Sequence, residues 1–141
     1  MSKTVLADTG YWIALFDSRE AEHETVAGTE DLIETLTLIV PWPILYETLR
    51  TRFVRRRDWV ARLDERLKRR NVSFVDDRDY CDEAYSLAVE YSTRLGRPIS
   101  MVDMLCRLLI ADPKIRVDYM LTTNAADFHD VCRTHRVEIL L

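Results

Sequence analysis

The sequence predicts an α/β fold, in which a five-stranded parallel sheet lies between helices in a single three-layer domain. Five short β-rich runs alternate with longer helical segments along the chain, a pattern typical of right-handed crossovers between parallel strands. The 141 residues are 48% hydrophobic and 31% charged, which is the profile of one ordinary globular domain with its own core. Because no stretch has the composition of a linker, we expect one domain over residues 1–141.

Each predicted strand is a short run rich in apolar or β-branched residues. The predicted strands are residues 3–7, 38–40, 72–75, 119–122 and 137–140. Pro41 ends the second strand because proline has no N–H to donate to a sheet. A sheet of this kind is buried on both faces, so its covering helices must supply most of the remaining core.

The segments between the strands carry helical signals. The expected helices are a short apolar one at 11–16, an amphipathic one at 22–36, one from Pro43 to about Arg56, one capped by Asp58, two at 79–95 and 100–111, and a helical turn at 125–130. Pro43 suits a first helical turn, where its missing N–H is not needed. Gly96-Arg97-Pro98 combines a glycine cap with a proline stop, and therefore separates the fifth helix from the sixth.

Charge is distributed unevenly along the chain. The formal net charge of −4 and the pI near 5.4 argue, by themselves, against a nucleic-acid-binding protein. Residues 50–70, however, contain ten basic and three acidic residues, so this segment has a local charge of +7 and the other 120 residues carry −11. The molecule is therefore bipolar, and the overall pI does not exclude an RNA substrate.

Composition excludes several other kinds of chemistry. Cys81, Cys106 and Cys132 are isolated and have no metal-ligand spacing, so we expect small core residues rather than disulfides or thiolate sites. Three glycines and no phosphate-binding glycine motif argue against a nucleotide loop. No apolar run approaches the roughly 20 residues that span a bilayer, so we expect a cytoplasmic protein with no membrane partner.

Acidic and polar residues follow the predicted strands at one edge of the sheet. Asp8 comes directly after the first strand, residues 122–124 follow the fourth, and Asp127 lies one turn further on. Glu47 lies on the helix after the second strand, and Asp103 begins the helix that leads toward the fourth. In open parallel sheets, ligands bind outside the carboxyl ends of the strands, so these acids are candidates for one site.

Several carboxylates in one pocket need a counter-charge, because like charges at short range raise each other's pKa. A divalent cation supplies it, and a set of oxygen donors without histidine or cysteine favours Mg²⁺ or Mn²⁺ over Zn²⁺. Such a site suits phosphodiester hydrolysis, since a bound ion activates water and offsets charge on the phosphate.

A local structural role stays open for each acid. Asp8 can cap the helix that follows it, and Asp103 stands three residues after a serine, the spacing of a capping box. Glu47 can pair with Arg50, three residues on along its helix. Asp127 can serve the short helix in which it lies.

Four motifs resemble those of the PIN-domain ribonucleases, in the same order and spacing and across essentially the whole chain. They are VLADTGYWIALFD, VPWPILYETLR with its lone glutamate, ISMVDMLCRLLIAD and LTTNAADF. The length suits the single-domain VapC-type toxins of toxin–antitoxin pairs. The resemblance implies a Rossmann-like fold with a five-stranded parallel sheet, metal-dependent cleavage of RNA, an inhibitory antitoxin partner and a homodimer.

The resemblance also implies roles for particular residues. The acidic quartet that would hold Mg²⁺ or Mn²⁺ comprises Asp8, Glu47, Asp103 and Asp127. The polar residues that would support it are Thr9, Ser100, Thr122 and Asn124. Asn124 lies where many relatives have another aspartate, so either Asn124 or Asp127 completes the site.

Basic and aromatic residues have two interpretations each. Arg50, Arg52 and Arg55 either form a solvated helical surface or contact RNA phosphates without reading sequence. Trp42, Trp59 and Tyr11 are either core residues or base-stacking residues, and aromatic side chains more often belong to the core.

Two other function classes fit parts of the sequence. A PIN-like domain without catalytic activity would bind RNA or a protein partner and leave the RNA intact. A receiver-like or phosphatase-like domain would use Asp8 as a phosphoacceptor, but the position two residues after Asp8 is Gly10 rather than a second acid.

Overall fold

The computed structural model describes residues 2–141 and contains a five-stranded parallel sheet. The strands are β1 (Thr4–Ala7), β2 (Thr37–Pro41), β3 (Val72–Val75), β4 (Tyr119–Leu121) and β5 (Glu138–Ile139). Their order across the sheet is β3-β2-β1-β4-β5, and every neighbouring pair is parallel. The predicted fold class is therefore confirmed.

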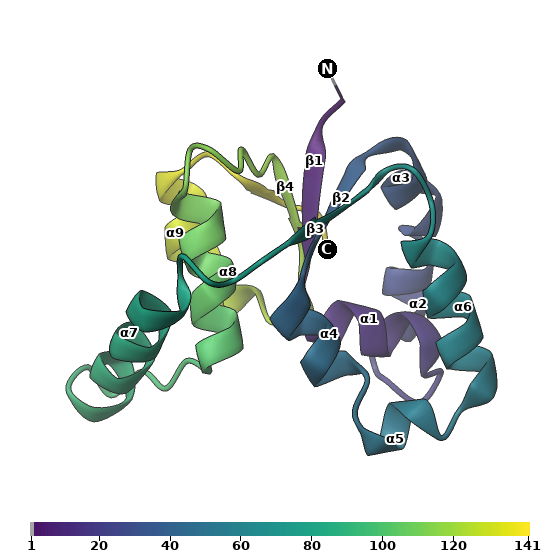
Figure 1. Ribbon diagram of the computed structural model, residues 1–141, viewed down its shortest axis with the longest axis horizontal. Coiled ribbons are helices and arrows are strands. Elements are labelled where there is room, and N and C mark those ends of the chain that lie inside the picture. The colour runs from purple at the N-terminus through teal and green to yellow at the C-terminus, as the bar shows by residue number, and fades with distance from the viewer. Residues whose placement is uncertain (1) are drawn as a thin grey trace.

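Helices cover both faces of this sheet. They are α1 (Thr9–Phe16), α2 (His23–Ala27), α3 (Glu30–Thr35), α4 (Trp42–Thr48), α5 (Thr51–Val54), α6 (Arg57–Leu67), α7 (Cys81–Thr93), α8 (Met101–Ala111) and α9 (His129–Thr134), with a 3₁₀ turn η1 (Ala125–Asp127). Figure 1 shows the sheet almost edge-on, with α7, α8 and α9 on one side and α1, α2 and α6 on the other.

The central strand and the helix after it form the middle of the core. Val5, Leu6 and Ala7 of β1 are fully buried, as expected for a strand covered on both faces. In α1, which is apolar almost all round, Tyr11 and Trp12 are also buried. Because β2 lies on one side of β1 and β4 on the other, the strand order reverses at β1, and the carboxyl ends of β1 and β4 border the crevice where such folds bind ligands.

The predicted helix at 22–36 is wrong as a single element. The chain instead forms α2 and α3, which are separated by Gly28 and Thr29. Glycine weakens a helix interior, and the Thr29 hydroxyl donates to the carbonyl oxygen of Val26 at 2.7 Å. The Tyr11 hydroxyl lies 2.7 Å from the same Thr29 oxygen, so a contact with α1 fixes the bend.

The predicted helix from Pro43 to Arg56 is also two helices, α4 and α5. Leu49 leaves the helical region (φ −82°, ψ 43°) and Arg50 is extended. The predicted N-cap, Asp58, lies inside the first turn of α6, and the cap position belongs to Arg56. Asp58 therefore acts near the positive end of the helix as a first-turn acid rather than as a capping side chain.

The predicted turn at 125–130 divides into η1 and α9, with Phe128 between them. Phe128 is fully buried, so the packing of its ring decides where the turn ends. The short, mostly polar sequence around Phe128 does not reveal this packing. The expected burial of cysteines holds for Cys106 and Cys132, whereas Cys81 is half-buried.

Among residues 2–141, none of the helices is both long and apolar enough to cross a membrane.

Candidate active site

Asp8 lies at the carboxyl end of β1, where it is only 4% exposed. One carboxylate oxygen accepts a hydrogen bond from the Tyr11 N–H at 2.9 Å and thereby caps α1. The other oxygen accepts from the Thr122 hydroxyl at 2.5 Å. Thr122 directly follows β4 and is also buried, so the capping role of Asp8 and its place beside the β4 edge occur together.

Glu47 lies on α4 and is half-buried. Its carboxylate accepts a hydrogen bond from the Thr9 hydroxyl, at the first position of α1. This contact joins the helix after β2 to the helix after β1. Glu47 therefore turns toward the Asp8 loop, rather than pairing with Arg50.

Asp103 occupies the first turn of α8. Its backbone N–H donates to the hydroxyl of Ser100, the N-cap, at 3.1 Å, so the serine half of the predicted capping box is present. Burial raises the pKa of Asp103 to about 7, with a further contribution from the negative charges of Asp8, Glu47 and Asp127. The four predicted acids thus act on one another electrostatically.

Asp127 ends η1, and its carboxylate accepts a hydrogen bond from the Asn124 side-chain amide at 2.6 Å. The Asn124 N–H donates to the Thr122 hydroxyl at 3.0 Å. Asn124 therefore supports both Thr122 and Asp127, and the two candidates for the fourth position are hydrogen-bonded to each other.

The charge of this carboxylate cluster (Asp8, Glu47, Asp103 and Asp127) has no protein counter-ion. Burial raises the pKa of Asp8 also, and the charges of Glu47 and Asp127 add to this effect, against the hydrogen bonds from Thr122 and Tyr11. Among residues 2–141, no arginine, lysine or histidine forms an ion pair with any of the four. The cluster therefore favours either protonation or a bound cation.

The donor set fits a hard divalent cation, because it consists of carboxylate, hydroxyl and amide oxygens. In the described part of the chain, no three His, Cys, Asp or Glu side chains are already arranged so that they could hold a metal ion. Carboxylates without a cation repel one another, and three of these four are held by Thr122, Thr9 and Asn124. Side-chain rotation would therefore accompany binding of an ion.

Glycine at position 10 belongs to the same site, a role that the sequence motifs did not predict. A Cβ atom at Gly10 would lie 2.7 Å from the Thr123 hydroxyl and 3.7 Å from a carboxylate oxygen of Asp8. A side chain at position 10 would therefore force the Thr123 side chain out of its place beside Asp8. The signal in the sequence is the glycine in the first turn of an otherwise strong helix.

The basic segment is mostly occupied by contacts within the protein. Arg50, Arg52 and Arg55 are all exposed, and the Arg52 guanidinium also forms an ion pair with the buried carboxylate of Asp17 at 3.1 Å. Further along, the basic residues that contact acids of α3 or α6 are Arg56, Arg62, Arg66, Lys68 and Arg69. The acids from outside the segment, Asp17, Glu30 and Glu34, reduce the local charge of +7 to +4 in the folded chain.

The aromatic residues divide between the two predicted roles. Tyr11 and Trp59 are core residues. Trp42 is 42% exposed and stacks on Phe74, with ring centroids 4.8 Å apart. Trp42 is therefore the candidate of the three that is accessible to a base.

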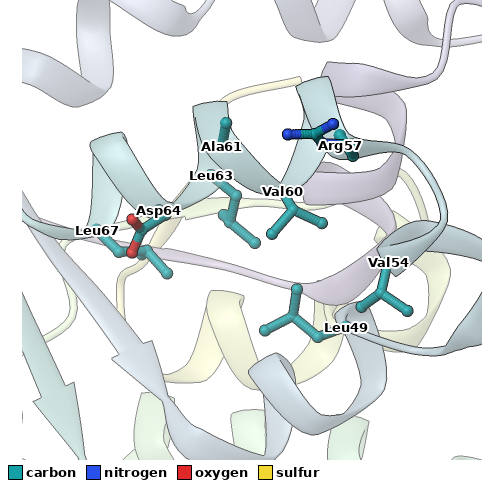
Figure 2. Close-up of a pocket in the computed structure, with 8 residues that line it drawn as sticks. All are labelled: Leu49, Val54, Arg57, Val60, Ala61, Leu63, Asp64 and Leu67. Carbon is teal, nitrogen blue, oxygen red and sulfur yellow. The ribbon is translucent and has the colours of Figure 1, made fainter.

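A pocket of about 440 Å³ lies on α6 and the α4–α5 connection, away from the carboxylate cluster. Figure 2 shows Leu49, Val54, Val60 and Leu63 directed into this space. None of its lining residues is a predicted site residue. The carboxylate cluster is therefore recognised by its charges and its place on the sheet, rather than by the size of a cavity.

Solved structures share this arrangement of strands and helices. Over 89% of this chain and 94% of the other, the fold matches Mycobacterium tuberculosis VapC20, with a TM-score of 0.68 and 21% sequence identity. This chain has the VapC fold. A second VapC-fold match is the structure of VapBC2 from Rickettsia felis, which covers 97% of both chains with a TM-score of 0.62 and 16% identity.

The two relatives differ in what they act on or bind. VapC20 is a toxin that cleaves the sarcin-ricin loop, and VapBC2 was solved bound to a DNA fragment from its promoter. No protein-family model and no curated protein sequence matches this chain. The likeness to VapC structures therefore lies in the fold, which is the fold that the motif resemblance implies.

Proposed function

We propose that this protein is a divalent-metal-dependent endoribonuclease and the toxin of a VapBC-like toxin–antitoxin pair. The observation that carries the proposal is the carboxylate cluster at the switch point of a VapC fold, where burial and mutual repulsion raise the pKa of Asp103 to about 7 and no basic side chain of residues 2–141 pairs with the cluster. A buried acid whose pKa is strongly shifted by burial and by neighbouring charges is typical of functional sites.

The residues of the site have distinct tasks in this proposal. Asp8, Glu47, Asp103 and Asp127 would hold Mg²⁺ or Mn²⁺, which when bound activates water and offsets charge on the phosphate. The polar residues that orient these acids are Thr9, Ser100, Thr122 and Asn124. These hydrogen bonds keep each acid at this edge of the sheet, and the carboxylates would rotate from there onto an arriving ion.

RNA is the substrate class that the fold similarity and the charge distribution support. VapC20 acts on the sarcin-ricin loop, and Arg50 and Arg55 are exposed at the two ends of α5, the short helix that follows the one carrying Glu47. The resemblance to VapC toxins further implies an antitoxin that inhibits the enzyme, and a homodimer. The expectation of an antitoxin partner is best supported by the fold match to VapBC2, which was solved bound to a DNA fragment from its promoter.

Binding of Mn²⁺ tests the proposal against an inactive PIN-like domain. We expect the melting temperature of the metal-free protein to rise with Mn²⁺ concentration, because an ion that binds only the folded state stabilises it. The same preparation should cleave RNA in Mg²⁺ or Mn²⁺ and remain inactive in EDTA. An unchanged melting temperature together with RNA binding but no cleavage would favour the inactive alternative.

Charge reversal of Arg50 and Arg55 tests the RNA contact. We expect the double variant Arg50→Glu/Arg55→Glu to bind RNA more weakly, and its salt dependence to fall by about one unit of slope for each phosphate that is no longer bound. Arg52 is left unchanged because it pairs with Asp17. Arg70→Glu, at an exposed site beyond α6, is the control; equal affinity and slope in both variants and the wild type would disprove the contact.

A further inference from the structure

A buried arginine lies one helical turn beyond Asp103. Arg107 is 7% exposed and sits on α8 among the buried residues Cys106 and Leu109. A guanidinium in such surroundings is costly unless its hydrogen bonds are satisfied. The partners of Arg107 therefore indicate what it contributes.

Arg107 contacts the segment that carries Asp127. Its Nη1 donates to the backbone carbonyl of Asp127 at 2.8 Å. The same nitrogen and Nη2 donate to the two carboxylate oxygens of Asp130, each at 2.8 Å. This two-pronged geometry is stronger and more directional than a single ion pair, and the three bonds join α8 to η1 through Asp127 and to the first turn of α9 through Asp130.

A second arginine binds the same turn from the loop before α8. Arg97 donates to the backbone carbonyl of Ala126 at 3.0 Å and to both carboxylate oxygens of Asp130 at 3.2 Å. Hydrogen bonds from Arg107 first, and then from Arg97, hold the pKa of Asp130 well below its usual range. Asp130 therefore stays ionised and binds both guanidinium groups.

Other contacts also hold this turn. Phe128, which follows it, is fully buried, and Asn124 bonds the Asp127 carboxylate and the Thr122 hydroxyl. Within η1, the Asp127 N–H donates to the Asn124 carbonyl at 3.2 Å and the Phe128 N–H to the Ala125 carbonyl at 3.0 Å. A single 3₁₀ turn with two such bonds has little intrinsic stability. The charged donors that bind the consecutive carbonyls of Ala126 and Asp127 therefore add to its order.

We propose that Arg107, together with Asp130 and Arg97, is a positioning device that holds the Asp127 turn against α8 and so fixes Asp127 relative to Asp103. Arg107 is a positioning residue, because its contact with Asp127 is through the backbone and it acts on the site through that carboxylate. Its consequence for metal binding and cleavage rests on the proposed function. The order of the turn itself does not depend on that function.

Arg107→Lys keeps the charge but cannot span the Asp127 carbonyl and both Asp130 oxygens. The matched control is Arg66→Lys, because Arg66 is 5% exposed, pairs with two glutamates of α3 and donates to a backbone carbonyl, that of Glu30. Both variants replace a buried, carboxylate-paired arginine. One lies beside the carboxylate cluster and the other between α6 and α3.

Amide hydrogen exchange gives a readout that needs neither metal nor activity. We expect the amides of Asp127 and Phe128 to exchange about tenfold faster or more in Arg107→Lys, since this variant removes charged hydrogen bonds to the turn. Arg66→Lys should leave them at the wild-type rate. Wild-type exchange of these amides in Arg107→Lys would overturn the proposal.

If Arg107→Lys fails to fold, Arg97→Ala is the second variant. It removes the hydrogen bond to the Ala126 carbonyl from a partly exposed position, and should speed the hydrogen exchange of the same two amides.

Metal titration and kinetics then separate positioning from mere stability. For Arg107→Lys we expect Mn²⁺ affinity about 10 to 100 times weaker and a lower kcat with little change in the KM for RNA. Arg66→Lys should lose stability but keep both. Wild-type Mn²⁺ affinity and kcat in Arg107→Lys would contradict the positioning role. If the wild type neither binds Mn²⁺ nor cleaves RNA, the proposed function fails, and hydrogen exchange alone decides whether the arginine holds the turn.

Discussion

Asp8→Asn and Asp103→Asn are each expected to lower metal-dependent RNA cleavage by about a hundredfold or more. A bound cation contributes several kcal/mol to phosphoryl chemistry, and each 1.36 kcal/mol changes a rate tenfold. Asparagine preserves the shape of the side chain and an oxygen that can accept from Thr122 or the Tyr11 N–H. The loss should therefore come from weaker cation binding rather than from unfolding, and is measured as kcat/KM on an RNA substrate in Mg²⁺.

Asp112→Asn is the matched control for Asp103→Asn. Asp112 is the C-cap of α8, at the opposite end of the helix from Asp103, and its carboxylate accepts from the Tyr80 hydroxyl at 2.5 Å. This variant should cleave RNA at the wild-type rate. Wild-type activity in both Asp8→Asn and Asp103→Asn would show that the carboxylate cluster is not the active site.

In metal-free protein, Asp103→Asn is expected to raise stability at pH 8 and to leave it nearly unchanged near pH 4. The folded protein keeps a proton on Asp103 up to a pH of about 7, because of burial and its acidic neighbours, whereas the unfolded chain releases it near its ordinary pKa of 3.8. Between these values the folded state binds more protons, so the free energy of unfolding falls as pH rises. The penalty is fully present above pH 7.

The size of this effect is on the order of 1–2 kcal/mol once screening by solvent is allowed for, or roughly 3–8 °C in melting temperature for a domain of this size. Melting curves of the two proteins in EDTA, at half-unit steps from pH 4 to pH 8, measure the difference. Mn²⁺ should reverse its sign at pH 8, because the ion stabilises the wild type more. The pKa of Asp112 is lowered, mainly by the Tyr80 hydrogen bond, so Asp112 is ionised in both the folded and the unfolded state above about pH 5, and the stability difference between wild type and Asp112→Asn should stay nearly constant from there to pH 8. Parallel curves for wild type and Asp103→Asn would disprove the raised pKa of Asp103 and the charge repulsion at this edge.

Local patterns were sufficient for the elements whose signals are strong and short-range. The run 3–7 became β1, the Ser100 cap began α8, and alternation of strands with helices was enough to predict a parallel sheet. By contrast, the sequence predicted one continuous helix across Gly28 and another across Leu49. In the structure, α2 ends at the first of these residues and α4 at the second. At the first of these breaks, the contact between Tyr11 of α1 and Thr29 outweighs weak intrinsic helix propensity.

The sequence alone was enough to predict the fold class, because the alternation of strands and helices sets the parallel sheet. It also singled out Asp8, Glu47, Asp103 and Asp127, whose role as metal ligands stays a prediction. Only the tertiary structure decided which side chain orients which acid: Thr122 for Asp8, Thr9 for Glu47, and Asn124 for Asp127. It also paired Arg107 with Asp130, and Arg52 with Asp17. Hydrogen bonds and ion pairs join residues far apart in the chain, and their partners are set by packing geometry, which no local pattern encodes.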